Sequence, residues 1–253
     1  LAFVRERGPV HPREVEQHFA HGSVKNYWGG SSNATTRLLD GLHYRGMLRV
    51  VRRDSGTRVY EAVTHAPADE SPAGRAQRAA ALIDLVVRKY APLPAASLTY
   101  LVRLLGYGAP HLSAQTQAAL RLAREELASC RIDGTTWYWP AGENPASRRH
   151  APDDEVRLLA PFDPVVWDRR RFELLWGWTY KFEAYTPAPQ RRFGYYALPL
   201  LWHDRVIGWA NVTAPEGRLQ PSFGYVGRKP RDAAFSAALD DELQRMTQFL
   251  ARR

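Results

Sequence analysis

Residues 161–171 read Pro161-Phe162-Asp163-Pro164-Val165-Val166-Trp167-Asp168-Arg169-Arg170-Arg171, and residues 185–196 read Tyr185-Thr186-Pro187-Ala188-Pro189-Gln190-Arg191-Arg192-Phe193-Gly194-Tyr195-Tyr196. Both segments combine prolines, arginine clusters and aromatic rings at a density that ordinary packing does not require. Guanidinium groups fork onto phosphates, and aromatic rings stack on unpaired bases. The two segments therefore indicate a surface that handles nucleic acid.

The two segments lie in a strand-rich stretch, residues 155–229. A helix is predicted over Asp168–Trp176, and a tight turn at His203-Asp204. A closing helix from about Arg231 to Arg253 carries an apolar stripe that we interpret as a packing face. Closure of a sheet removes its exposed edges, so we predict a small β-barrel-like domain followed by a C-terminal helix. The candidate strands are Arg157–Leu159, Tyr180–Tyr185, Tyr195–Trp202, Arg205–Thr213 and Arg218–Val226.

The first 65 residues follow a different order of elements. Helices are predicted over residues 1–7 and Pro12–Phe19, and a longer helix with Ser31 or Ser32 as its N-cap. Two alternating strands, Leu48–Arg53 and Arg58–Ala62, then form a hairpin. Three helices followed by a hairpin predict a winged helix.

This order repeats between residues 75 and 140. The sequence predicts helices over Ala76–Tyr90, over Ser97–Leu105 with Ser97 as a cap, and over Ser113–Ser129. A second hairpin, Arg131–Trp139, turns at Asp133-Gly134. We therefore predict an α+β protein with two tandem winged helices, 1–65 and 75–140, and a β-barrel-like domain with a C-terminal helix at 155–253.

Composition limits the class of protein. The chain has 253 residues, 45% of them hydrophobic, and a single cysteine, which excludes an internal disulfide. Its apolar runs are shorter than the ~20 residues needed to cross a bilayer, so we expect no membrane span. The net charge is +9, with an excess of +4 in each of the segments 1–65 and 155–229. Such an excess favours polyanions.

Two groups of side chains are candidates for contacts with DNA. Basic residues on the third helix and hairpin of the first module and in the 155–229 segment suit phosphates. A competing interpretation is that the basic side chains only solvate the surface and that the rings fill the core. The phosphate-binding candidates are Arg37, Arg45, Arg52, Arg53, Arg169, Arg170, Arg171, Lys181, Arg191 and Arg192, and the base-stacking candidates are Tyr185, Phe193 and Tyr195.

The acids of the first segment have two interpretations. Asp163 and Asp168 could supply a general base or a metal ligand. The interpretation that we favour is structural: Asp168 caps the helix that carries the arginine triplet, and Asp163 forms an Asx-turn before Pro164. The histidines show no spacing typical of a metal site, so we expect neither a metal nor a cofactor.

The C-terminal sequence resembles that of the bacterial winged-helix DNA glycosylases, the AlkZ-like and YcaQ-like proteins. The resemblance extends from Leu158 to Asn211 and more weakly over residues 8–60. It implies a DNA-repair protein that acts on double-stranded DNA with alkylated or crosslinked bases, in the bacterial cytoplasm at the nucleoid, and we expect a monomer. The matching motifs are Leu158-Leu159-Ala160-Pro161-Phe162-Asp163-Pro164, Trp167-Asp168-Arg169, Tyr185-Thr186-Pro187-Ala188-Pro189 and Leu198-Pro199-Leu200-Leu201.

The resemblance also raises a question about catalysis. In the resembled family, a Gln-hydrophobic-Gln or Gln-hydrophobic-Asp motif of an N-terminal winged helix holds the hydrolytic water. Here Gln115-Thr116-Gln117 has threonine at the central position, so no catalytic residue is assigned. Because Leu1 lies within the predicted helix over residues 1–7 and no capping residue precedes it, we expect a truncated and catalytically incomplete chain. The alternative is a winged-helix transcription regulator or protein-interaction scaffold, which would not need the 155–229 segment.

Overall fold

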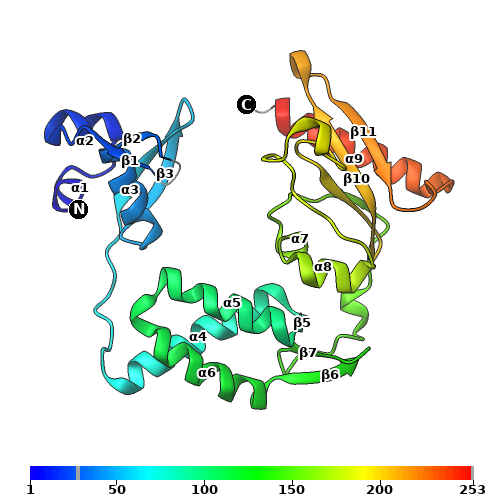
Figure 1. Cartoon of the computed structure of the whole chain (residues 1–253), viewed down its shortest axis with the longest axis horizontal. Coiled ribbons are helices and arrows are strands. Elements are labelled where there is room, and N and C mark those ends of the chain that lie inside the picture. The colour runs from blue at the N-terminus through cyan, green and yellow to red at the C-terminus, as the bar shows by residue number, and fades with distance from the viewer. Residues whose placement is uncertain (27–28, 252–253) are drawn as a thin grey trace. The chain divides into compact units, whose positions relative to one another are not determined.

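The computed structural model describes residues 1–26 and 29–251 as a mixture of helices and small sheets, which confirms the α+β class (Figure 1). The chain divides into two compact units. One comprises Leu1–Ile83 with Val102–Leu122, and the other Asp84–Leu101 with Ala123–Arg253. The boundary passes through α4 (Pro72–Tyr90), α5 (Ala95–Gly108) and α6 (Ser113–Glu126). The division into 1–65, 75–140 and 155–253 stays a prediction.

The N-terminal part of the first unit surrounds a small apolar core. An isolated antiparallel bridge joins Val10 to Tyr60, so the segment between the first two helices lies along the hairpin. The core consists of Val4, Val10, Val15, Leu39, Leu48 and Tyr60. The elements are α1 (Ala2–Arg7), α2 (Pro12–Phe19), β1 (Ser23–Lys25), β2 (Ser31–Asn33), α3 (Ala34–Tyr44), β3 (Leu48–Asp54) and β4 (Thr57–Ala62).

Helix α3 begins later than the sequence predicted. Asn33 caps it, because the Asn33 Oδ1 accepts a hydrogen bond from the Thr36 N–H at 2.8 Å. The prediction of a serine cap was wrong, since Ser31 and Ser32 instead belong to β2, which pairs with β1.

Both predicted hairpins are confirmed. Strands β3 and β4 are joined through Ser55 and Gly56, and β6 (Ala128–Ile132) and β7 (Thr135–Trp139) through Asp133 and Gly134. All four turn residues have positive φ, between 47° and 82°, as type I′ turns require. A short strand β5 (Leu93–Pro94) joins the second hairpin in the order β5-β7-β6. Helix α6 ends at Glu126, so Ser129 lies in β6 and not in the predicted helix.

The sheet of the second unit is open, which corrects the prediction of a β-barrel. Its four strands follow the order β11-β10-β9-β8, and within the described residues β11 and β8 do not meet. Residues 180–185, predicted as a strand, are irregular, so one strand fewer is available for closure. The strands are β8 (Val156–Leu158), β9 (Leu198–Trp202), β10 (Arg205–Thr213) and β11 (Gln220–Tyr225). The helices that follow β8 are α7 (Pro164–Trp167), α8 (Arg169–Trp176) and α9 (Ala233–Ala251). Short 3-10 turns lie at Arg148–His150, Ala188–Gln190 and Pro215–Gly217, and another lies at Pro110–Leu112 in the first unit.

The two faces of this sheet carry separate cores. Consecutive residues of a strand point to opposite faces. Leu200 accordingly packs with Phe235 and Leu239 of α9, whereas Leu201 packs against the cluster that contains Phe172 of α8. One face of the sheet thus packs against the cluster that contains Phe172 of α8, and α9 covers the other face.

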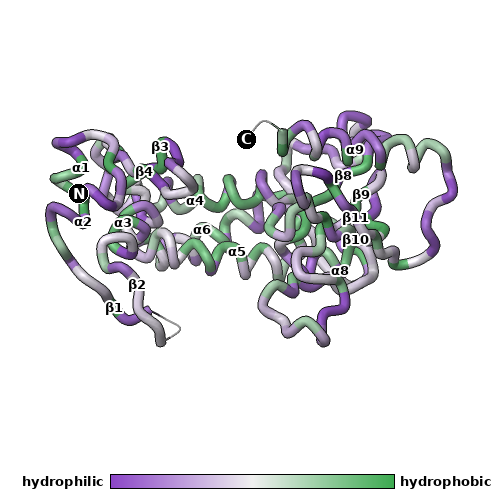
Figure 2. Tube along the Cα trace, turned by 90° about the horizontal axis from the view of Figure 1, so that it is seen from above, coloured by the Kyte–Doolittle hydropathy of each residue, from purple (hydrophilic) through white to green (hydrophobic). Residues whose placement is uncertain are grey.

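The hydropathy of the chain is highest in several helices and strands. Figure 2 shows hydrophobic stretches along α4 and α5. In the part of the chain that the structure describes, no helix is both long and apolar enough to span a membrane.

Candidate nucleic-acid interface

The arginine triplet sits in the first turn of α8, which Asp168 caps. The Asp168 Oδ1 accepts a hydrogen bond from the Arg171 N–H at 3.1 Å. Asp163 caps the preceding helix by accepting from the Val165 N–H at 2.8 Å. Both aspartates therefore act as caps, in agreement with the structural interpretation.

A helix turns by about 100° per residue, so the three arginines point in three directions. Arg171 is only 4% exposed, and its guanidinium donates to the carbonyls of Tyr90 and Pro164. Burial lowers the pKa of Arg171 from its ordinary value. The expectation that Arg171 lies on the surface was therefore wrong, because its side chain ties α8 to the end of α4.

Arg169 is half-buried, and its guanidinium also donates to backbone carbonyls. Its Nη1 donates to the Val166 carbonyl at 2.7 Å and its Nη2 to the Pro161 carbonyl at 2.9 Å. The guanidinium carbon lies 4.4 Å from the centre of the Tyr180 ring, and burial lowers the pKa of Arg169. Arg170 alone of the triplet is exposed, and it forms no ion pair with a described residue.

The loop from Tyr185 to Gly194 is held by a buried carboxylate. Glu183 is 4% exposed and accepts hydrogen bonds from the Phe193 N–H at 2.7 Å and the Gly194 N–H at 3.3 Å. Burial pushes the pKa of Glu183 upward, but the backbone donors outweigh it and hold the pKa below its usual value.

Asn211 of β10 holds the same loop from the other side. Its Nδ2 donates to the Phe193 carbonyl at 2.7 Å. Gly194 has φ 120°, and a Cβ there would collide with the Asn211 amide, so only glycine fits. The loop backbone is thus fixed by hydrogen bonds at both its N–H and carbonyl groups.

This fixed loop presents its two arginines differently. Arg191 is half-buried; its Nε donates to the Thr186 carbonyl at 2.7 Å and its guanidinium lies 5.0 Å from the Tyr195 ring centre. Arg192 is exposed, with its guanidinium 5.2 Å from the Phe193 ring centre. Neither forms an ion pair with any residue that the structure describes, and the same holds for exposed Lys181.

A set of touching rings lies in the same compact unit as these cations. Phe182 contacts Phe162 at 5.1 Å, Tyr196 at 5.3 Å and Tyr185 at 6.3 Å between ring centres. Tyr185 is 94% exposed and Tyr195 60%. We group these rings with Tyr195 and the cations of the same segments under the name aromatic–cationic face; its members are Phe162, Phe182, Tyr185, Tyr195, Tyr196, Arg170, Lys181, Arg191 and Arg192.

Phe193 does not belong to this face. It is 5% exposed and packs against Trp178, Tyr180 and Trp209, so the prediction that it stacks on a base does not fit its position. The neighbouring Tyr180 donates its hydroxyl to the Ala197 carbonyl at 2.6 Å, and burial raises its pKa to about 12.

Sequence reasoning missed Phe162 and Phe182 as members of the face. A usable signal was present for Phe162, since a ring between Pro161 and Asp163 in a turn has no regular element to pack it inward. Phe182 carried no such signal, because it was placed in a strand that does not form.

In the first unit, the cations predicted to bind phosphates differ in whether they already pair with a carboxylate. Arg52 forms a two-point ion pair with Asp54, at 3.0 and 3.2 Å, which neutralises its charge. Arg37 donates to the Lys25 carbonyl and Arg53 to the Gly56 carbonyl, and neither has a carboxylate partner among the described residues. Arg45 is exposed, beside a shallow cavity of about 650 Å³ on α3.

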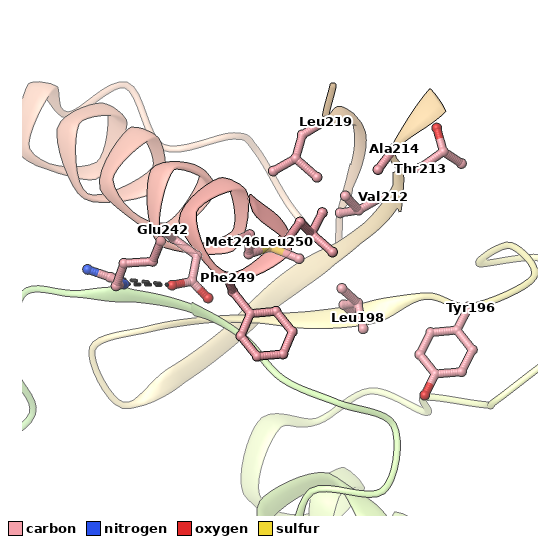
Figure 3. A pocket seen from close by; sticks show the side chains of 11 residues that line it. Tyr196, Leu198, Val212, Thr213, Ala214, Leu219, Glu242, Met246, Phe249 and Leu250 are labelled. Carbon is pink, nitrogen blue, oxygen red and sulfur yellow. Dashed lines mark hydrogen bonds and ion pairs between the residues drawn. The ribbon is translucent and has the colours of Figure 1, made fainter. Parts of the chain in front are cut away.

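A second hollow lies where the end of α9 meets the sheet. This cavity, of about 480 Å³, has mostly apolar walls. Figure 3 shows Met246 and Leu250 facing Leu198 and Val212. Its one carboxylate, Glu242, is satisfied by the Leu158 N–H and by Arg245. The cavity therefore offers packing surface and no free acid.

Among the described residues, no group of three or more His, Cys, Asp or Glu side chains could hold a metal ion. The second unit instead carries exposed cations and exposed rings in the segments around Phe162–Arg170 and Lys181–Tyr196.

The sequence model of the family described as "DNA glycosylase AlkZ-like" matches residues 1–249. No solved structure was found to match the chain.

Proposed function

The chain belongs to the AlkZ-like DNA glycosylase family, and from this premise we propose that its aromatic–cationic face binds double-stranded DNA during base repair. Proteins of such a family act on DNA. The face offers phosphates cations that form no ion pair with a described residue, and it offers exposed rings to an unstacked base. The observation that carries the proposal is the 94% exposure of Tyr185, next to Thr186, whose carbonyl holds the Arg191 side chain.

We further propose that the two helix–hairpin segments are tandem winged helices. The order α1, the Val10 bridge, α2, α3, β3 and β4 supports the first. The order α4, β5, α5, α6, β6 and β7 supports the second, where β5 pairs with the hairpin as the first strand of a winged helix does. Arg37, Arg45 and Arg53 would then add phosphate contacts in the first module.

The damage that we propose is an alkylated purine or an interstrand crosslink. A bulky or crosslinked base distorts the duplex, and an exposed ring such as Tyr185 gains stacking energy only where a base is unstacked. Hydrolysis is not assigned to a residue of this chain, since the sequence has no Gln-hydrophobic-Gln or Gln-hydrophobic-Asp motif.

The salt dependence of DNA binding tests the proposal. The triple variant R170A/K181A/R192A removes three exposed cations of the face, and R88A/R205A/R218A removes three exposed cations elsewhere in the same unit. The slope of log affinity against log salt concentration should become shallower by up to ~0.9 for each phosphate that the first variant no longer neutralises. Equal slopes in the two variants would place the DNA on another surface.

A further inference from the structure

A cavity at the start of α8 shares Phe162 and Arg170 with the aromatic–cationic face and adds groups of α5, α7 and the α8 cap. Its volume is about 500 Å³, within the range of small-molecule sites. Ser97 and Tyr100 of α5 form one wall, and Phe162, Trp167, Asp168 and Arg170 form the other. All six residues belong to the second compact unit.

Two buried polar atoms, one in each wall, have no hydrogen-bond partner among the described residues. They are the Ser97 Oγ, on a residue 2% exposed, and the Asp168 Oδ2, on a residue 7% exposed. Leaving such a buried group unpaired destabilises the fold. A ligand that supplied partners to both would recover this energy.

Ser97 differs from Thr99 and Thr247, two other hydroxyl residues in helices. The Thr99 and Thr247 hydroxyls donate to carbonyls four residues earlier in their helices, at 2.8 and 2.9 Å. Ser97 makes no such bond. Its hydroxyl therefore has no hydrogen-bond partner among the described residues, and it can both donate and accept.

Asp168 restricts what the ligand can be. Its Oδ1 is committed to capping α8, and as a carboxylate its Oδ2 can only accept a hydrogen bond. The ligand must therefore present an N–H or O–H donor there, next to an acceptor for Ser97. A nucleobase carries this pairing of donor and acceptor along its base-pairing edge.

The remaining walls suit a flat ring with a phosphate. The rings of Tyr100 and Trp167 are 24° from parallel with centres 6.2 Å apart, and Phe162 is 59% exposed. Arg170 is the exposed cation at the edge of the cavity, since Arg169 is committed to carbonyls. Phe162 also touches Phe182, so the cavity adjoins the aromatic–cationic face.

We propose that this cavity binds one unpaired nucleotide of the DNA, with its base-pairing edge on Asp168 and Ser97 and its phosphate at Arg170. The proposal rests on the proposed function, because it requires the adjoining face to hold the duplex. It assigns no bond cleavage to Asp168.

Binding of three matched duplexes tests the pocket: one fully paired, one with a single bulged 2-aminopurine, and one with a bulged abasic site. The protein should bind the 2-aminopurine duplex about tenfold more tightly than the paired duplex, as one stacked base supplies. The abasic bulge should show no such preference. Stacking in the pocket should also quench the 2-aminopurine fluorescence.

Two substitutions separate the pocket from the face. Ser97→Ala removes the unpaired hydroxyl, and Asp168→Asn keeps a capping oxygen while replacing the free acceptor by a donor. Both should abolish the preference for the bulge and leave affinity for the paired duplex unchanged. Thr99→Ala, on the same helix, is the control that should change neither.

The outcomes distinguish the two proposals. K181A/R192A, which leaves Arg170 of the pocket in place, should weaken binding to all three duplexes, and its failure to do so would count against the face. A bulge preference that survives in Ser97→Ala overturns the pocket, because this variant loses no bond of the fold. Equal binding of the base and abasic bulges, or no preference in the unsubstituted protein, also overturns it.

Discussion

The Phe193 N–H donates a 2.7 Å hydrogen bond to the buried carboxylate of Glu183, ten residues earlier in the chain. With the Gly194 N–H on the same oxygen, this contact closes the loop that presents Tyr185 and Arg192. An exposed ring and an exposed cation would otherwise move independently. Glu183 is thus a positioning residue of the aromatic–cationic face.

Replacing Glu183 by Gln should destabilise the second unit. The neutral amide oxygen accepts more weakly than a carboxylate, and its NH₂ group has no acceptor provided for it. Hydrogen bonds to charged groups contribute about 1.5–3 kcal/mol, so we expect a loss of about 1–3 kcal/mol in urea unfolding. Glu126→Gln, at an exposed position, is the control and should unfold like the original protein. Equal stability of the two variants would mean that Glu183 does not hold the loop.

The same carboxylate predicts a pH dependence. Because the folded-state pKa of Glu183 lies below its ordinary value of 4.5, the ionised group stabilises the fold above that pH. This contribution falls as the pH drops through the folded-state pKa. The difference in unfolding free energy between the protein and its Glu183→Gln variant should therefore be constant from about pH 7 to 5.5 and shrink below about 4.5. A difference that grows on acidification would reverse the assigned shift.

Tyr185 should matter for DNA binding and not for stability. A side chain that is 94% exposed contributes little packing, whereas stacking on a base is worth about 1–3 kcal/mol. Tyr185→Ala should weaken binding to a duplex with an unpaired base and leave the melting temperature unchanged. Tyr185→Phe should retain the affinity, since the ring and not the hydroxyl stacks. Tyr107, 72% exposed, gives the control Tyr107→Ala.

The hairpin of the first module provides a contrast between paired and unpaired arginines. Arg49 and Arg52 form ion pairs with Glu61 and Asp54, whereas Arg45 and Arg53 have no carboxylate partner among the described residues. R45A/R53A should therefore reduce the salt slope of DNA binding more than R49A/R52A. Filter binding at several salt concentrations measures both, and the reverse order would refute the phosphate contacts assigned to this module.

Local sequence patterns predicted much of the fold. Strand Arg205–Thr213, helix Pro12–Phe19 and the turns at Asp133 and His203 follow from alternation, helical spacing and turn chemistry, which are properties of neighbouring residues. The cap at Asp168 follows for the same reason.

Features that depend on distant partners were not predictable. Residues 180–185 alternate like a strand, but Glu183 is buried to accept backbone hydrogen bonds from the loop ten residues later. The arginine triplet reads as one cluster, yet its helical geometry separates Arg170 from buried Arg171. Ser97 resembled a cap, and only the start of α5 at Ala95 places it in a cavity wall.

Photo-crosslinking tests the central claim most directly, since it records contact with DNA at a chosen residue. A benzoylphenylalanine introduced at Tyr185, on the aromatic–cationic face, should crosslink to a labelled duplex at moderate salt, and the same group at Tyr107 should not. Crosslinking at Tyr107 with none at Tyr185 would contradict the account and move the DNA away from the face.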